Sequence, residues 1–146
     1  MSPVRDVVAA VDFSAHSERV LSCAIELVSA LGARLHLVHS YMDVPSQLLE
    51  HNVWIPEDVW ARIRDEDGVR LEVLRARAAA AGLEVQVHQS PNPAGEAIAE
   101  HARKLGAGLI VMGTRGHSGL KQALLGSVAR KTLRAAPCPV VVVPAD

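Results

Sequence analysis

The alternation of strand-like and helix-like segments along the chain constrains its fold more than any other feature. Short apolar runs typical of buried strands alternate with longer segments whose apolar residues recur at helical spacing. Strands that alternate with helices predict an α/β fold, an open parallel sheet with right-handed crossovers and helices on both faces. The expected strands are residues 7–11, 34–40, 83–88, 109–112 and 139–144, and the expected helices are one that contains Val20 to Leu31, 56–81, 94–105 and one that follows Ser127.

Size and charge narrow the classes of function. A chain of 146 residues with 49% hydrophobic residues can bury the core of one domain, which we expect to span residues 1–146. The formal net charge is −1 and there are four aromatic residues, so nucleic acid is not an expected partner. No apolar stretch reaches the roughly 18 residues of a membrane span, and the first residues lack signal-peptide features. We therefore expect a cytoplasmic protein.

A glycine-rich loop follows the fourth expected strand. Gly113 and Gly116 come directly after the apolar run, and Gly126 and Ser127 stand nine residues later at the expected start of a helix. Glycines let backbone N–H groups approach an anion, and a helix N-terminus attracts phosphate. The loop is neither a Walker A motif, because no lysine precedes Ser127, nor a dinucleotide fingerprint, which would follow the first strand. The alternative is that the glycines only shape a turn and cap a helix.

Asp12 follows the first expected strand and offers a second feature of a nucleotide site. Ligands of open parallel sheets lie beyond the carboxyl ends of strands where the strand order reverses. If the first and fourth strands are neighbours, Asp12 meets the glycine loop there and can contact a ribose hydroxyl or Mg²⁺. Alternatively, Asp12 caps the first helix or shapes its turn, and Ser14 is an equally well placed cap.

The spacing Gly-x2-Gly-x9-Gly-Ser resembles the nucleotide-binding signature of the universal stress protein family. The resemblance extends to the opening sequence Val-Ala-Ala-Val-Asp-Phe-Ser and to the closing sequence Ala-Ala-Pro-Cys-Pro-Val-Val-Val-Val-Pro, and it covers essentially the whole chain. It implies an adenine nucleotide alpha hydrolase-like fold, a five-stranded parallel sheet in the order 3-2-1-4-5. It also implies the ATP-binding subgroup, whose members carry the glycine signature.

The resemblance assigns roles to particular residues. It places Asp12 beside the ribose or the metal, Val38 against the adenine, and Met112 and Gly113 near the nucleotide through their backbone. The residues that it implies hold the phosphates are Gly116, Gly126, Ser127 and Val128, with Arg115 as a further candidate. The implied cofactors are ATP and Mg²⁺. The residues themselves identify no protein partner.

The sequence offers no clear catalytic base. Near the expected crevice the titratable candidates are Asp12, His16 and His117, and no spacing marks them as a set. His36 and His39 stand three apart in a strand and therefore point to opposite faces, so they cannot bind one metal together. These features favour a nucleotide-dependent switch or regulator in the stress response. The alternatives are a weak ATPase or phosphotransferase, and a homodimeric interaction module that needs no nucleotide.

The last expected strand suggests a dimer. An apolar strand at a sheet edge invites pairing with another chain, and the family resemblance implies pairing across a two-fold axis. The pairing residues would be Val140, Val141, Val142 and Val143. Alternatively, the flanking Pro139 and Pro144 protect the edge of a monomer.

Overall fold

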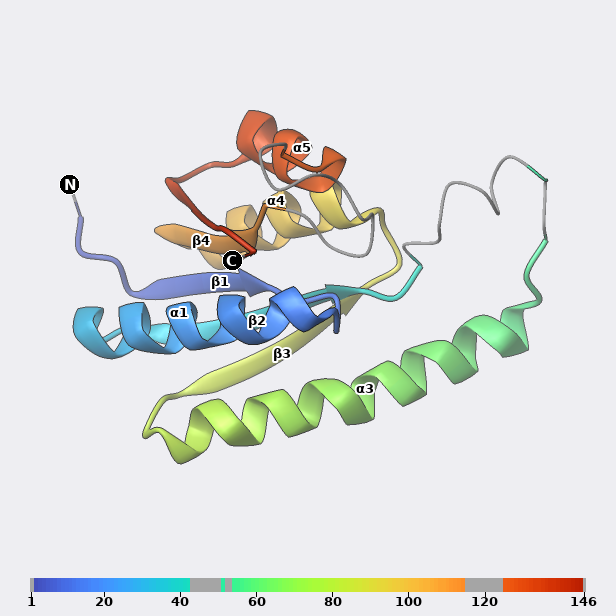
Figure 1. Cartoon of the computed structure of the whole chain (residues 1–146), viewed down its shortest axis with the longest axis horizontal. Helices are drawn as coiled ribbons and strands as arrows, with labels where there is room; N and C mark the ends of the chain where they lie inside the picture. The colour runs from blue at the N-terminus through green and yellow to red at the C-terminus, as the bar shows by residue number, and fades with distance from the viewer. Residues whose placement is uncertain (1, 43–50, 52–53, 115–124, 146) are drawn as a thin grey trace.

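A computed structural model describes residues 2–42, 51, 54–114 and 125–145 (Figure 1). The five strands form one sheet in the order β3-β2-β1-β4-β5, and every neighbouring pair is parallel. This order and the α/β class confirm the expectation from the sequence. The strands are β1 (Asp6–Ala10), β2 (Arg34–Ser40), β3 (Val85–Ser90), β4 (Leu109–Gly113) and β5 (Val140–Val143).

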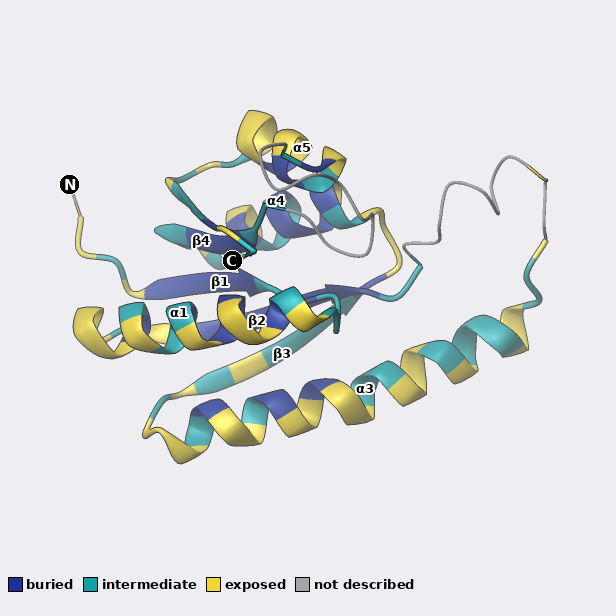
Figure 2. Cartoon of the chain, viewed as in Figure 1, coloured by how far each residue is buried: buried dark blue, intermediate teal, exposed yellow. Residues whose placement is uncertain are grey.

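Helices cover both faces of the sheet. Helices α1 and α3 pack with one buried cluster, and α4 and α5 contribute to the other (Figures 1 and 2). A parallel sheet needs both faces covered because its strands are apolar on both sides. The helices are α1 (Ala15–Leu31), α3 (Glu57–Ala80), α4 (Ala94–Leu105) and α5 (Ser127–Ala135).

Successive residues of the central strand point into the two clusters. In β1, Val7 and Ala9 pack with the α1 side, whereas Val8 packs with the α4 side. All three are fully buried. Burial of one such aliphatic side chain contributes about 1.5–3 kcal/mol relative to its exposure. The alternation fixes the register of β1, because a slip by one residue would exchange the two faces.

Glycines end two helices where the sequence predicted a stop. Gly32 follows α1 with φ of 65°, and Gly106 follows α4 with φ of 64°. Both lie in the left-handed region, which side chains with a Cβ rarely adopt, and the N–H of each donates to a carbonyl of the last turn. The connections from α1 to β2 and from α4 to β4 are therefore short and sharply defined.

The structure corrects several details of the expected elements. β3 begins at Val85 rather than at Leu83, which packs against the core before the strand starts. Leu31 and Leu133, apolar residues of α1 and α5, are 46% and 44% exposed because each lies close to the end of its helix. Cys23 and Cys138 are free and partly exposed.

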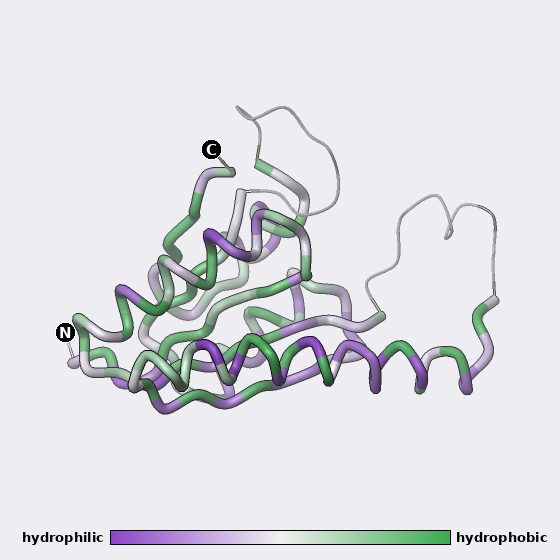
Figure 3. The backbone as a smooth tube through the Cα atoms, turned by 60° about the horizontal axis from the view of Figure 1, so that its bottom comes forward, coloured by the Kyte–Doolittle hydropathy of each residue, from purple (hydrophilic) through white to green (hydrophobic). Residues whose placement is uncertain are grey.

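α3 is only partly anchored to the sheet. Hydrophilic and hydrophobic residues alternate along it (Figure 3). Its buried residues, Leu71, Leu74 and Ala78, all lie in its second half. The first turns of α3 extend past the end of the sheet (Figure 1). Within the described residues, no helix is both long and apolar enough to cross a membrane.

Candidate functional site

The candidate site lies where the strand order reverses. β1 pairs with β2 on one side and with β4 on the other, so the first and fourth strands are neighbours as the site prediction required. The turn after β1 leads into α1, and the loop after β4 leads into α5 on the opposite face (Figure 1). Connections that leave neighbouring strands toward opposite faces mark the place where parallel α/β sheets bind ligands, and we call this place the crevice.

Asp12 shapes the turn between β1 and α1. Its Oδ1 accepts hydrogen bonds from the Ser14 N–H at 2.9 Å, the Ser14 hydroxyl at 2.6 Å and the Ser17 hydroxyl at 2.7 Å. Ser14 is the N-cap residue by its backbone but makes no side-chain cap bond. Asp12 thus shapes this turn through Oδ1, and its contact with a ribose hydroxyl or a metal stays a prediction.

The residue after Asp12 has an unusual backbone. Phe13 has φ of 61°, the only positive φ of a non-glycine residue in the described parts of the chain. Holding a bulky residue in that region costs about 1–3 kcal/mol, so surrounding contacts must stabilise it. The Phe13 ring lies 4.4 Å from the His39 ring, and the guanidinium of Arg70 lies 4.6 Å from the Phe13 centroid. The candidate site is therefore bordered by a strained turn.

The start of α5 is held against the end of β4. The Thr114 N–H donates to the Val143 carbonyl at 3.1 Å, and the Gly126 N–H donates to the Thr114 carbonyl at 2.7 Å. Gly126 is buried and is the N-cap of α5, followed by exposed Ser127 and half-buried Val128. A glycine has no side chain to cap the first N–H groups of the helix. Two ends of the glycine signature, Gly113 and Gly126, therefore come together, whereas Arg115, Gly116 and His117 lie outside the described residues.

Gly113 makes room for a histidine. A Cβ at Gly113 would lie 2.9 Å from Cε1 and 3.0 Å from Nε2 of His16. The His16 Nε2–H donates to the Val143 carbonyl at 2.7 Å, which ties α1 to the end of β5. His16 Nδ1 is buried and has no hydrogen-bond partner within the described parts of the chain. Packing against His16 is thus one reason for a glycine here, in addition to any approach of a nucleotide.

Val38 on β2 and Met112 on β4 are core residues. Val38 is 1% exposed and Met112 is 2% exposed, and both belong to the core cluster on the α4 side. The Val38 carbonyl accepts a hydrogen bond from the Val11 N–H at 3.0 Å. Their contacts with a nucleotide stay predictions, and for Met112 the predicted contact is through the backbone.

The two histidines of β2 point to opposite faces, as predicted. His36 Nε2 lies 2.9 Å from Oδ1 of Asp6, whereas His39 Nε2 lies 2.8 Å from Oδ2 of Asp67 on α3. No group of three or more His, Cys, Asp or Glu side chains in the described ranges could hold a metal ion. Mg²⁺ in nucleotide sites uses one or two carboxylates plus phosphates and water. Asp12 is compatible with that smaller requirement.

The family model for the universal stress protein family matches residues 3–144. The chain belongs to the universal stress protein family. It is 36% identical over 141 residues to universal stress protein YxiE of Bacillus subtilis, covering 92% of this chain and 95% of that protein.

Among solved structures, the chain is similar to a universal stress protein in complex with cAMP, with 25% identity, a TM-score of 0.69 and coverage of 99% of this chain and 100% of that one. It also shares its fold with the Archaeoglobus fulgidus universal stress protein in complex with dAMP, with 24% identity, a TM-score of 0.70 and coverage of 97% and 98%.

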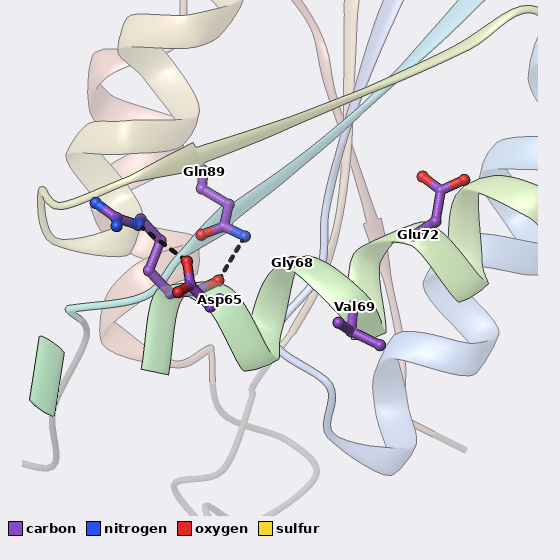
Figure 4. A pocket seen from close by; sticks show the side chains of 6 residues that line it. Asp65, Gly68, Val69, Glu72 and Gln89 are labelled. Atoms are coloured by element: carbon purple, nitrogen blue, oxygen red, sulfur yellow. Dashed lines mark hydrogen bonds and ion pairs between the residues drawn. The ribbon is translucent and has the colours of Figure 1, made fainter. Parts of the chain in front are cut away.

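A surface groove on α3 of this universal stress protein is separate from the crevice (Figure 4). It is lined by Arg64, Asp65, Gly68, Val69, Glu72 and Gln89. The Gln89 Nε2 donates to the Arg64 carbonyl at 3.1 Å, and a Cβ at Gly68 would lie 3.1 Å from that nitrogen. Gly68 thus leaves space for a contact between α3 and β3. None of the residues predicted for the nucleotide lines this groove.

Proposed function

We propose that this universal stress protein binds ATP with Mg²⁺ in the crevice between the ends of β1 and β4, and that the bound nucleotide acts as a switch in the stress response. The observation that carries the proposal is the hydrogen bond from Gly126 to Thr114, which holds the start of α5 at the end of β4. The site lies at the strand-order reversal. A related universal stress protein forms a complex with cAMP, which shares the adenosine unit.

The phosphates would bind at the first turn of α5. The first N–H groups of a helix have no intrahelical partners, and its N-terminus carries a partial positive charge. Ser127 and Val128 supply backbone N–H groups there, and exposed Ser127 adds a hydroxyl. Gly126 puts no side chain between this turn and a phosphate. These features support the predicted phosphate role of the three residues. The phosphate contacts of Gly116 and Arg115 stay predictions.

Asp12 would meet the ribose or the metal from the other side of the crevice. Its Oδ1 is engaged by Ser14 and Ser17, which fixes the direction of the carboxylate. A carboxylate that is already held in place loses little further side-chain freedom when it meets a ribose hydroxyl or Mg²⁺. Bound Mg²⁺ would neutralise phosphate charge, with the phosphates and water completing its ligands.

A switch fits the crevice better than dedicated catalysis. Phosphoryl transfer needs a group that orients the nucleophile. His16 is the described histidine closest to Gly113, but its Nε2–H is already bonded to the Val143 carbonyl. A bound nucleotide can instead favour one conformation over another if its affinity for the two differs. A product assay during the binding experiment distinguishes the weak ATPase alternative.

The test compares two substitutions at one position. Gly126→Asp and Gly126→Asn add side chains of nearly the same size, and both residues are favourable helix N-caps. Only aspartate places a negative charge where the phosphates would lie. We expect calorimetry on nucleotide-stripped protein to show saturable ATP–Mg²⁺ binding by the wild type and at least about tenfold weaker binding by Gly126→Asp than by Gly126→Asn. Equal affinities of the two folded variants would contradict the phosphate site, and no wild-type binding would contradict the function.

We further propose a homodimer through β5. β5 pairs with β4 at one edge of the sheet, and the carbonyls of Pro139 and Val143 accept hydrogen bonds from β4 and Thr114. By alternation, the backbone groups of Val140 and Val142 point to the outer edge. Val142→Pro would remove an outward N–H and leave the bonds to β4 in place. Light scattering should show a wild-type dimer and a folded Val142→Pro monomer, and a monomeric wild type would support edge protection by Pro139 and Pro144.

A further inference from the structure

His39 has a hydrogen-bond acceptor at each of its ring nitrogens. Nδ1 lies 2.8 Å from the carbonyl oxygen of Val11, and Nε2 lies 2.8 Å from Oδ2 of Asp67 on α3. The histidine is buried, and the Asp67 side chain is 14% exposed. A carbonyl oxygen cannot donate, and an ionised carboxylate can only accept. Nδ1 therefore carries a proton and donates to the Val11 carbonyl. With Asp67 ionised, Nε2 donates as well, and His39 and Asp67 would form an imidazolium–carboxylate pair beside the β1–α1 turn.

This imidazolium contacts the chain on both sides of Asp12. Its Nδ1–H holds the Val11 carbonyl, and its ring packs against Phe13 at 4.4 Å. The other end of the Val11–Asp12 peptide is held as well, because the Asp12 N–H donates to the Ser17 hydroxyl at 3.0 Å. The peptide plane before Asp12 is fixed at both ends, and the left-handed residue after it is supported by the imidazole. These contacts determine how Asp12 is presented to the crevice.

The charged groups described around His39 come from α3. Asp67 pairs with the His39 ring. Arg70 lies 3.7 Å from Asp67, and its guanidinium lies over the Phe13 ring, 4.6 Å from the centroid. On the neighbouring strand β3, the register partner of His39 is the neutral Gln89. The three side chains of Asp67, His39 and Phe13 thus connect α3 to the turn that carries Asp12.

We propose that His39 is a positioning residue for the nucleotide site, an imidazolium that links α3 to the Val11–Asp12 peptide and so sets the orientation of Asp12. This inference rests on the proposed nucleotide binding. His39 itself does not touch the ligand in this account. It acts through the Val11 carbonyl, so the donor at Nδ1 matters for affinity, whereas the donor at Nε2 anchors α3.

Two variants separate these two donors. The amide nitrogen of asparagine lies near the place of Nδ1, so His39→Asn can keep the bond to the Val11 carbonyl and lose Asp67. Glutamine reaches the place of Nε2, so His39→Gln can keep the bond to Asp67 and lose Val11. Misplacing a group that orients a ligand costs about 10–100-fold in affinity in comparable supporting shells. We expect His39→Gln to bind ATP–Mg²⁺ about tenfold more weakly than His39→Asn, by calorimetry, with thermal unfolding as the check that both fold.

A spectroscopic measurement tests the charge of His39 without any nucleotide. Nitrogen–proton correlation spectra of the imidazole at neutral pH should show protons on both ring nitrogens in the wild type, and a single ring proton in Asp67→Asn. One ring proton in the wild type would overturn the imidazolium. Equal affinities of His39→Asn and His39→Gln would overturn the positioning role while the wild type still binds. Absence of wild-type binding would instead contradict the proposed function and remove the role of His39 with it.

Discussion

Replacing Gly113 by alanine gives a sharp test of how the end of β4 is packed. The added Cβ would lie 2.9 Å, 3.0 Å and 3.1 Å from Cε1, Nε2 and Nδ1 of His16. The ring cannot easily move away, because its Nε2–H is bonded to the Val143 carbonyl at 2.7 Å. Overpacking of this kind costs about 1–3 kcal/mol. Gly113 is not among the described glycines with positive φ, so backbone strain adds nothing to that cost.

The cost of Gly113→Ala depends on His16, so a double-mutant cycle tests this contact directly. His16→Ala removes the ring and one hydrogen bond worth about 1 kcal/mol. The Val143 carbonyl keeps its bond from Thr114. Without the clash, alanine at position 113 should be neutral or stabilise by about 0.4–1 kcal/mol, because it restricts the unfolded chain. We therefore expect a coupling energy of about 2 kcal/mol between the two positions.

The assay is urea unfolding of the wild type, Gly113→Ala, His16→Ala and the double variant, followed by far-ultraviolet circular dichroism. Gly113→Ala should lower the urea midpoint and the free energy of unfolding by about 1–3 kcal/mol. In the His16→Ala background the same substitution should cost nothing. If Gly113→Ala costs the same in both backgrounds, with a coupling energy below about 0.5 kcal/mol, contact with His16 does not explain the glycine.

Three further predictions concern the stability of the fold away from the candidate site. The hydrogen bond from the Arg34 guanidinium lowers the pKa of Asp6 below its usual value, although burial opposes this. The free energy of unfolding of the wild type should therefore exceed that of Arg34→Gln above about pH 4, and the difference should disappear as the pH falls further. Urea titrations at a series of pH values measure this difference. Gly106→Ala should destabilise by about 1 kcal/mol because φ is 64°, whereas Gly106→Asn should cost less, and equal losses in thermal unfolding would refute the left-handed cap. Gly68→Ala should stabilise by up to about 1 kcal/mol, since the Gln89 amide can shift by a few tenths of an ångström, and a lower Tm would show that it cannot.

The pattern of strands and helices could be predicted because it depends on local periodicity. The bounds of β2 and α4 were predicted to the residue, and the glycine stops at Gly32 and Gly106 follow from conformational freedom alone. The start of β3 was missed by two residues, because pairing with β2 decides where that strand begins. The exposed positions of Leu31 and Leu133 were not predicted, because periodicity does not show where a helix leaves the sheet.

The site was predictable only in outline. The spacing of glycines and the place of Asp12 located the crevice, but the sequence left open whether Asp12 shapes the turn, which the bonds from Ser14 and Ser17 now show. His39 on a strand pairs with Asp67 on a helix, 28 positions away in the sequence, and no local sequence pattern predicts this contact. The only sequence signal was that His39 faces the side opposite to His36.

The most direct test of the nucleotide site is an amide nitrogen–proton correlation spectrum during titration with ATP and Mg²⁺. We expect the largest shifts at Asp12, Thr114, Ser127 and Val128, which surround the crevice. Amides around the groove on α3, such as Val69 and Gln89, should change little. Saturable shifts confined to the α3 groove, or no shifts at the start of α5, would contradict the proposed nucleotide site.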